Sequence, residues 1–209
     1  VIIHQWIFRV SSAPEVGGGH VMRCLSIGRE LSKYKSVHFL LCSGGECWID
    51  RIKYYSMTAS IYRSPMEMKN KNVLVDGYEF SELEIQDWRE KCKYMALIDD
   101  NNSAADYIDL VISTRMDNII KKNYKDQMVL HGNKYALLAS EYIRGVPHNT
   151  KKVTNILVSC GLIDSNNFTS NVLEALSECA FQGDVNIAIG GQAPNLKKIL
   201  NSINSYSFS

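Results

Sequence analysis

The sequence has no excess of charge of either sign and no long apolar run. Its 23 basic and 22 acidic side chains nearly cancel over 209 residues, which argues against nucleic acid or an anionic membrane surface as the main partner. No apolar run reaches about 18 residues, and the start lacks the basic-then-apolar pattern of a signal peptide. We therefore expect a soluble, cytoplasmic protein without stable membrane insertion.

Cysteine is present, but not in a pattern that indicates disulfide bonds or a metal site. The six cysteines are scattered through apolar segments, as is typical of reduced, buried thiols in a cytoplasm. The closest pair, Cys42 and Cys47, has no histidine or further cysteine at zinc-ligand spacing nearby. The sequence therefore predicts neither a metal site nor a bound cofactor.

The two best-known nucleotide fingerprints are also missing. The glycines at 17–19 do not form G-x-G-x-x-G, because Met22 stands where the third glycine belongs. The chain also has no G-x-x-x-x-G-K-[ST] loop. A nicotinamide site and nucleoside triphosphate hydrolysis are therefore disfavoured.

The most informative stretch that is present runs from Gly17 to Leu25, where three glycines lead directly into His20 and a helical apolar pattern. Glycines let backbone amides approach a ligand closely, and a helix start carries unpaired N–H groups and partial positive charge. A neutral imidazole there is a plausible base, because the same charge disfavours its protonation. The alternative is that His20 merely caps the helix or bonds a backbone carbonyl.

Apolar segments of two kinds alternate along the first 150 residues. Short β-branched and aromatic runs predict strands, and apolar residues spaced by three and four predict helices. This alternation favours an α/β fold with a doubly wound, Rossmann-like parallel sheet, in which ligands lie beyond the carboxyl ends of the strands. The predicted strands are 2–10, 36–42, 58–62, 72–75, 94–98, 109–113 and 127–130, and the predicted helices are 20–33, 46–55 and 81–91.

A polar break at 147–152 predicts a domain boundary, with domains at 1–148 and 153–209. Beyond it the pattern restarts, with strands at 155–160 and 185–189, a helix at 168–179 and a helix beginning at 194–200. Two β-α units can bury little core alone. We therefore expect the second domain to be the beginning of a larger one, cut short relative to a two-domain parent.

Polar residues gather where the predicted strands end. Arg23 could reach a phosphate or a strand-end carboxylate across one helix turn, or be a solvated surface residue. Tyr78 could bond sugar hydroxyls or cover the sheet edge. For Asp99 and Asp100, which are adjacent in a loop, we expect turn or helix-capping roles rather than a catalytic carboxylate pair.

Several motifs resemble one known family. Phe8–Ser12 followed by Val16–Ile27 resembles F-R-x-D-x-S…I-G-x-G-H-x-x-R-x-L-x-L-A, the opening of the UDP-sugar hydrolases of pseudaminic acid synthesis, which spore-coat polysaccharide proteins share. Further matches follow in the same order. They are Val75–Tyr78 with I-D-x-Y, Ile98–Asp100 with a D-D loop, Tyr135–Leu138 with Y-A-L-[IL], and Leu157–Asp164 with the G-G-T-D turn of a second domain.

The resemblance implies a two-domain GT-B fold, a monomer, and removal of UDP from UDP-2,4-diacetamido-2,4,6-trideoxy-β-L-altropyranose by inverting, metal-independent attack of water at the anomeric carbon. It implies His20 as the base and Tyr78 as the residue that positions the water or a substrate group, with the diphosphate chiefly against the second domain. Ser11 stands where the family usually has Asp. The other substrate-binding residues that it implies are Gly17, Gly18, Gly19, Arg23, Asp76, Gly161 and Asp164.

Two other functions stay open at this point. A GT-B glycosyltransferase would use an acceptor hydroxyl in place of water, although the sequence shows no hydrophobic, basic-flanked loop for a lipid acceptor. A relative that binds a nucleotide sugar without turnover is the second alternative.

Overall fold

The computed structural model describes residues 5–100, 105–114, 127–144 and 153–205. The chain divides into two compact units, one of residues 1–14 and 19–144 and one of residues 15–18 and 145–209. Each unit has its own sheet. The polar break expected at 147–152 lies outside the described residues.

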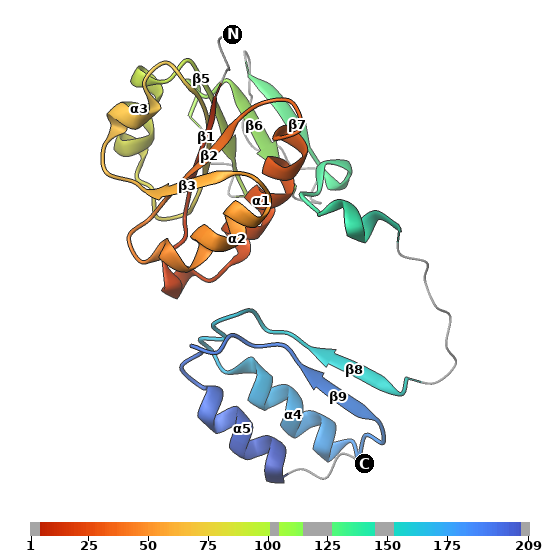
Figure 1. The fold of residues 1–209 in the computed structure, drawn as a ribbon. Coiled ribbons are helices and arrows are strands. Elements are labelled where there is room, and N and C mark those ends of the chain that lie inside the picture. The colour runs from red at the N-terminus through yellow and green to blue at the C-terminus, as the bar shows by residue number, and fades with distance from the viewer. Residues whose placement is uncertain (1–4, 101–104, 115–126, 145–152, 206–209) are drawn as a thin grey trace. The chain divides into compact units, whose positions relative to one another are not determined.

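The first unit is built on a seven-stranded sheet in the order β3-β2-β1-β4-β5-β6-β7, in which all neighbours pair in parallel (Figure 1). Most of its strand residues are buried, which explains why the strands read as near-continuous apolar runs. The strands are β1 Trp6–Val10, β2 Val37–Leu41, β3 Thr58–Ile61, β4 Asn72–Asp76, β5 Tyr94–Ile98, β6 Leu110–Ser113 and β7 Met128–His131.

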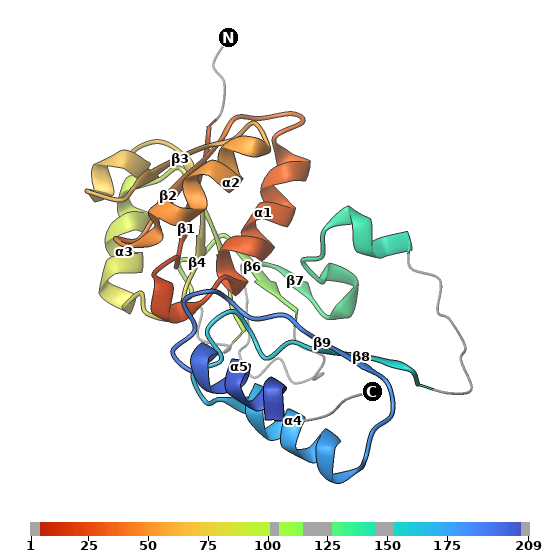
Figure 2. The ribbon, with the colours of Figure 1, turned by 60° about the horizontal axis from the view of Figure 1, so that its bottom comes forward.

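Helices cover both faces of this sheet. The helices α1 (Gly19–Leu31) and α2 (Ile49–Tyr54) pack with one buried cluster, and α3 (Glu82–Lys91) packs with a second cluster on the other face (Figures 1 and 2). A parallel sheet flanked in this way is a Rossmann-like α/β arrangement. The predicted fold class is confirmed to that extent.

Helix α1 forms where the sequence predicts it, because its buried residues lie on one face. Val21, Cys24, Leu25 and Gly28 recur at helical spacing and face the sheet. At Gly28 an added Cβ would lie 2.8 Å from the sulfur of Met57, so a side chain there would have to displace Met57. The helix therefore has a fixed position against the sheet, and its first turn is held at the carboxyl ends of the strands.

One predicted helix is shorter than expected. The pattern predicts a helix over 46–55, but a 3-10 turn occupies Gly45–Trp48 and α2 begins only at Ile49. Gly44 precedes this turn with φ of 86°. The other 3-10 turns are Pro14–Val16, Pro65–Met68, Asn133–Tyr135 and Ser140–Arg144.

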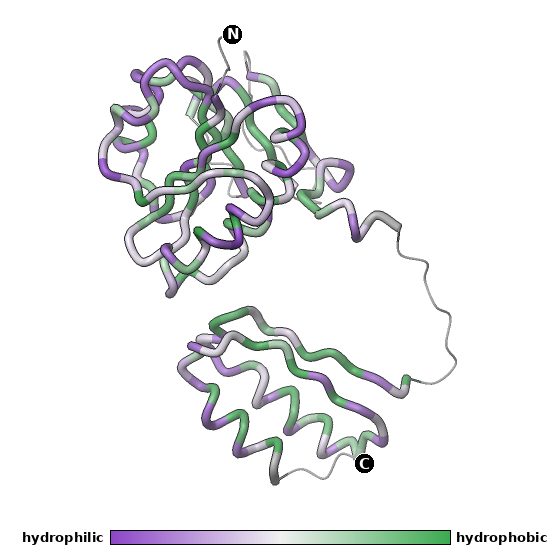
Figure 3. The backbone as a smooth tube through the Cα atoms, in the orientation of Figure 1, coloured by the Kyte–Doolittle hydropathy of each residue, from purple (hydrophilic) through white to green (hydrophobic). Residues whose placement is uncertain are grey.

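The second unit contains two parallel strands, β8 (Asn155–Val158) and β9 (Asp184–Ile187), and two helices, α4 (Phe168–Glu178) and α5 (Leu196–Ser205). The helices lie side by side, and hydrophobic and hydrophilic segments alternate along both (Figures 1 and 3). Leu173 of α4 and Ile199 of α5 are fully buried. Both strands are shorter than predicted.

Within the described part of the chain, no helix combines the length and apolar character needed to cross a membrane.

Candidate functional site

The strand order of the first unit identifies one point of the sheet as the candidate ligand-binding position. The chain moves from β1 to β2 on one side and returns to β4 on the other, so β1 and β4 are neighbours at the point where the winding direction reverses. Open parallel sheets bind ligands in the crevice beyond the carboxyl ends at such a point. The register pairs Val10 with Asp76 as the last residues of the two strands. Helix α1, which follows β1, and Asp76, which ends β4, therefore meet there.

His20, in the first turn of α1, is hydrogen-bonded to Asp76. The distance from Nδ1 to Oδ1 is 2.7 Å, and the histidine and aspartate side chains are 7% and 0% exposed. A carboxylate has no proton to donate, so Nδ1 carries a proton, and in the neutral form of the imidazole Nε2 then keeps its lone pair. This arrangement fixes both the orientation and the tautomer of the ring. His20 is thus prepared to accept a proton through Nε2.

Arg23, one helical turn after His20, joins two carboxylates. Its Nε and Nη2 donate to the two oxygens of Asp76 at 2.6 and 2.5 Å, and its Nη1 donates to Asp100 at 2.5 Å. The two carboxylates raise the pKa of Arg23 although burial acts in the opposite direction. A guanidinium engaged on both edges is a structural clamp. The structure therefore gives Arg23 a role in holding the site rather than an edge turned toward a phosphate.

Tyr78, two residues after β4, lies beside the histidine. The centroids of the Tyr78 and His20 rings are 4.6 Å apart in an edge-to-face arrangement. The phenol donates a hydrogen bond to Asp100 at 2.8 Å, and the residue is 60% exposed. Burial of the phenol and the neighbouring charge of Asp100 both raise the pKa of Tyr78. Tyr78 therefore stays protonated at neutral pH and is the accessible member of the group.

The surroundings of Asp100 and of Cys24 change the pKa of both groups. Burial alone would raise the pKa of Asp100, but hydrogen bonds from Arg23 and Tyr78 outweigh it and hold that pKa below its usual range. The thiol of Cys24 donates to Asp76 Oδ2 at 3.4 Å, and burial together with that carboxylate raises its pKa well above the ordinary value. Cys24 is therefore an inert donor and not a nucleophile.

The group as a whole bears one more negative than positive charge. Arg23 contributes one positive charge, Asp76 and Asp100 contribute two negative charges, and the neutral form of the His20 imidazole contributes none. Such a site stabilises a cation that develops nearby and disfavours a diphosphate at the same place. The charge therefore suits a group that becomes cationic better than it suits a diphosphate.

The sequence predicts other substrate-binding residues in this unit, and the structure places them differently. Asp76 is fully buried, so in this structure it acts through His20 and Arg23. Ser11, which follows β1, is also fully buried. Its backbone N–H donates to the carbonyl of Asp76, and its hydroxyl finds no partner in the described part of the chain. Both residues thus lie next to the site rather than on its surface.

The three glycines before His20 are not equivalent. Gly17 has φ of 83°, a conformation that favours glycine, whereas Gly19 is the first residue of α1 and a Cβ there would meet nothing within 4 Å. Gly18 lies between them in a bend and is buried. Only Gly17 requires glycine for backbone reasons, and Gly19 leaves space at the helix start.

Gly161 and Asp164, predicted to bind substrate in the second unit, lie in the turn between β8 and α4. Gly161 has φ of 89°. The Asp164 carboxylate accepts from the backbone N–H groups of Phe168 and Thr169 at 2.8 and 3.0 Å, which caps α4. Asp164 is 5% exposed. Two amides that could hold a phosphate at this helix start are therefore already occupied by the protein's own side chain.

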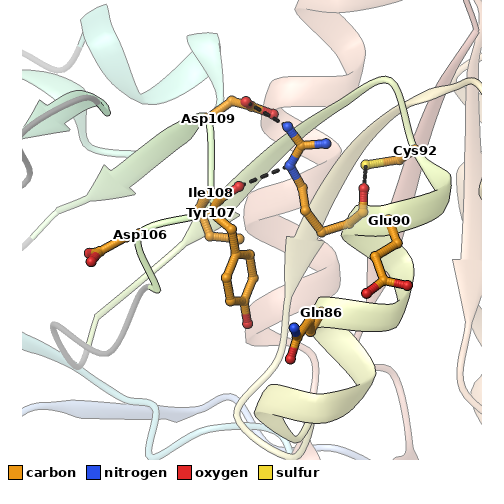
Figure 4. A pocket seen from close by; sticks show the side chains of 8 residues that line it. Gln86, Glu90, Cys92, Asp106, Tyr107, Ile108 and Asp109 are labelled. Atoms are coloured by element: carbon orange, nitrogen blue, oxygen red, sulfur yellow. Dashed lines mark hydrogen bonds and ion pairs between the residues drawn. The ribbon is translucent and has the colours of Figure 1, made fainter.

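Two cavities of the first unit lie elsewhere and suit other chemistry. A cavity of about 560 Å³ lies between α3 and the segment before β6 (Figure 4). Its guanidinium, Arg89, already donates to the carbonyl of Tyr107 and to Asp109. With Glu90, Asp106 and Asp109 also lining it, the cavity is net acidic and does not suit a diphosphate.

The second cavity, of about 410 Å³, lies between α1 and the sheet and is lined almost entirely by apolar side chains such as Trp6, Phe8 and Leu31. It offers no histidine for proton transfer. For metals, no group of three or more His, Cys, Asp or Glu is placed to share an ion among residues 5–100, 105–114, 127–144 and 153–205.

Asp100 is the residue of the site that sequence reasoning missed. It was expected to serve a turn or a cap, but the structure joins it to Arg23 and Tyr78. The usable signal is its position two residues after β5, the strand next to β4, because neighbouring parallel strands bring their carboxyl ends together. The contribution of Cys24 had no comparable signal.

The fold and these contacts define the class to which the first unit belongs, a Rossmann-like α/β unit with a histidine–aspartate pair at the switch point of its sheet. No family model matches the chain. In an alignment 214 residues long, the chain is 25% identical to the uncharacterized protein MJ1062 of Methanocaldococcus jannaschii. The alignment covers 93% of this chain and 44% of that protein, so the chain spans less than half the length of the curated relative.

Proposed function

We propose that this chain takes part in hydrolysis of a UDP-sugar, with His20 as the general base that activates water for attack at the anomeric carbon. The single observation that carries the proposal is the hydrogen bond between His20 Nδ1 and the buried Asp76, because it leaves Nε2 as the proton acceptor. The location at the carboxyl ends of β1 and β4 supports it.

In the proposed reaction a proton passes from water to Nε2 of His20 as the water oxygen bonds to the anomeric carbon. The bond between that carbon and the phosphate oxygen breaks, and its electron pair leaves with UDP. The transition state resembles an oxocarbenium ion, which the net negative charge of Arg23, Asp76 and Asp100 stabilises. Direct attack inverts the anomeric configuration.

The substrate that the sequence resemblance implies, UDP-2,4-diacetamido-2,4,6-trideoxy-β-L-altropyranose, is the one we propose. The diphosphate contacts belong, in this proposal, to the second unit, and a GT-B arrangement of the two units is part of it. The capping of α4 by Asp164 means that a phosphate there would use other amides or displace that carboxylate.

The test is to incubate the purified protein with this UDP-sugar in ¹⁸O-water and follow UDP release by chromatography. We expect ¹⁸O on the anomeric carbon of the free sugar and none in UDP. Replacing His20 with Asn should lower kcat roughly a hundredfold or more, since general-base catalysis contributes that much. His38→Asn is the matched control, because His38 lies on β2 and bonds Thr58 and Ser60 instead.

Each other outcome has a defined meaning. Retention of turnover in His20→Asn would exclude His20 as the base. UDP release that depends on an added acceptor would favour the glycosyltransferase, and binding of the UDP-sugar without turnover would favour the non-catalytic relative.

A further inference from the structure

Asp100 has no assigned part in the proposed reaction, yet it holds the one accessible phenol of the site. Its Oδ2 accepts both the Tyr78 hydroxyl at 2.8 Å and Arg23 Nη1 at 2.5 Å. The other two nitrogens of the Arg23 guanidinium, Nε and Nη2, donate to the fully buried Asp76. Asp100 is therefore connected through the guanidinium of Arg23 to a buried carboxylate at the end of β4.

This geometry determines which way the Tyr78 hydroxyl points its proton. A phenol has one proton to donate, and a carboxylate can only accept. The Tyr78 proton is thus committed to Asp100, and the phenol oxygen is left with lone pairs for any other partner. Without the carboxylate the hydroxyl could rotate and donate to a ligand.

We infer that Asp100 is a positioning residue that makes Tyr78 a hydrogen-bond acceptor toward the attacking water. The inference rests on the proposed function and deepens it. A water molecule that donates one O–H to His20 Nε2 and the other to Tyr78 Oη has a lone pair left for the anomeric carbon. The two rings are in edge-to-face contact, with centroids 4.6 Å apart, and the inference therefore places one water against both groups.

The first test measures how Asp100 affects the pKa of the Tyr78 hydroxyl, and it does not require the protein to be active. The protein is labelled with ¹³C in its tyrosine rings, the Tyr78 signal is assigned with Tyr78→Phe, and its ionisation is followed by NMR. The groups that face the phenol are Asp100 after β5 and the His20 and Arg23 side chains of α1. Asp100→Asn should lower the pKa of Tyr78, because the charge and hydrogen bond of Asp100 help to raise it.

Asp50→Asn is the matched control, since it makes the same chemical change at an exposed position of α2. It should leave the Tyr78 titration unchanged. An unchanged titration in Asp100→Asn would overturn the inference, whatever the protein's activity.

The second test asks whether Asp100 acts through Tyr78. We expect Tyr78→Phe and Asp100→Asn each to lower kcat on the order of tenfold with little change in KM, because positioning of the water matters in the transition state. In the double variant the two losses should not multiply. An undiminished effect of Asp100→Asn in the Tyr78→Phe background would overturn the inference. If the wild-type protein releases no UDP, the proposed function fails, and the Tyr78 titration still shows whether Asp100 holds the Tyr78 hydroxyl proton.

Discussion

The turns that lead into α1 and α4 follow the same plan but use the helix start differently. Each follows a parallel strand and contains a glycine with positive φ, 83° at Gly17 and 89° at Gly161. In α1 the first turn carries no acidic residue, and His20 there bonds Asp76 of another strand. In α4 the first amides are closed by Asp164 of the same turn.

This difference separates a local cap from a long-range contact. Asp164 satisfies amides four and five residues away, so it stabilises its own helix and little else. Asp76 lies 56 residues from His20 and joins two elements at the sheet edge. In the second unit the carboxylate at the helix start is a local cap. In the first unit the carboxylate comes from the end of another strand, and it orients a histidine.

The largest expected effect in this comparison of Asp76 with Asp164 is that of Asp76→Asn. The amide leaves the Arg23 guanidinium with fewer acceptors in a buried position, and loss of one partner of a buried pair costs about 3 to 5 kcal/mol. We expect that decrease in the free energy of unfolding, measured with urea. Turnover should fall as well, because the tautomer of His20 is no longer fixed.

The same substitution at Asp87 is the control for Asp76→Asn. Asp87 pairs with Lys91 on the surface of α3, where both side chains are partly exposed, so the change should cost no more than about 1 kcal/mol. Equal losses at the two positions would show that the buried clamp adds nothing to an ordinary surface pair.

Much of the fold could be predicted from the sequence because its strands are buried on both faces. Segments such as 94–98 and 72–75 read as apolar runs for that reason, and they correspond to β5 and β4. The start of α2 could not be predicted, since the residues of 45–48 fit a helical pattern but form a 3-10 turn after Gly44.

The candidate site was predictable only in part. His20 and Tyr78 each directly follow a glycine, His20 at the start of α1 and Tyr78 just after β4, which is a local signal. The partners of His20 and Arg23 depend on the register that places Asp76 opposite Val10, and no spacing in the sequence states that register. The adjacent acids Asp99 and Asp100 suggested a turn, and only the sheet order shows that the second one reaches Tyr78 and Arg23.

The shared feature of the two turns is tested by Gly17→Ala and Gly161→Ala. A side chain in the left-handed region costs about 1 to 2 kcal/mol, so both variants should lose comparable stability in thermal or urea unfolding. Gly19→Ala and Gly191→Ala are the matched controls, because an added Cβ there meets nothing within 4 Å and neither has positive φ. They should stay within about 0.5 kcal/mol of wild type. A loss at the controls as large as that at Gly17 and Gly161 would mean that positive φ is not what requires glycine at those two positions.

The smallest expected effect belongs to the cap. Asp164→Ala should destabilise α4 by about 1 kcal/mol and lower the hydrogen-exchange protection of the Phe168 and Thr169 amides, whereas exposed Asp184→Ala should not.

Burial alone would raise the pKa of Asp164, but hydrogen bonds from Thr169 and Phe168 hold it below the usual range. The folded-state pKa is therefore the lower one, so the stabilisation is complete above the unfolded value of about 3.9 and is lost as the pH falls through the folded value. Protection of the two amides should decrease over that acidic range in wild type and be independent of it in Asp164→Ala. If the wild-type protection showed no such decrease, Asp164 would not be the helix cap that distinguishes α4 from α1.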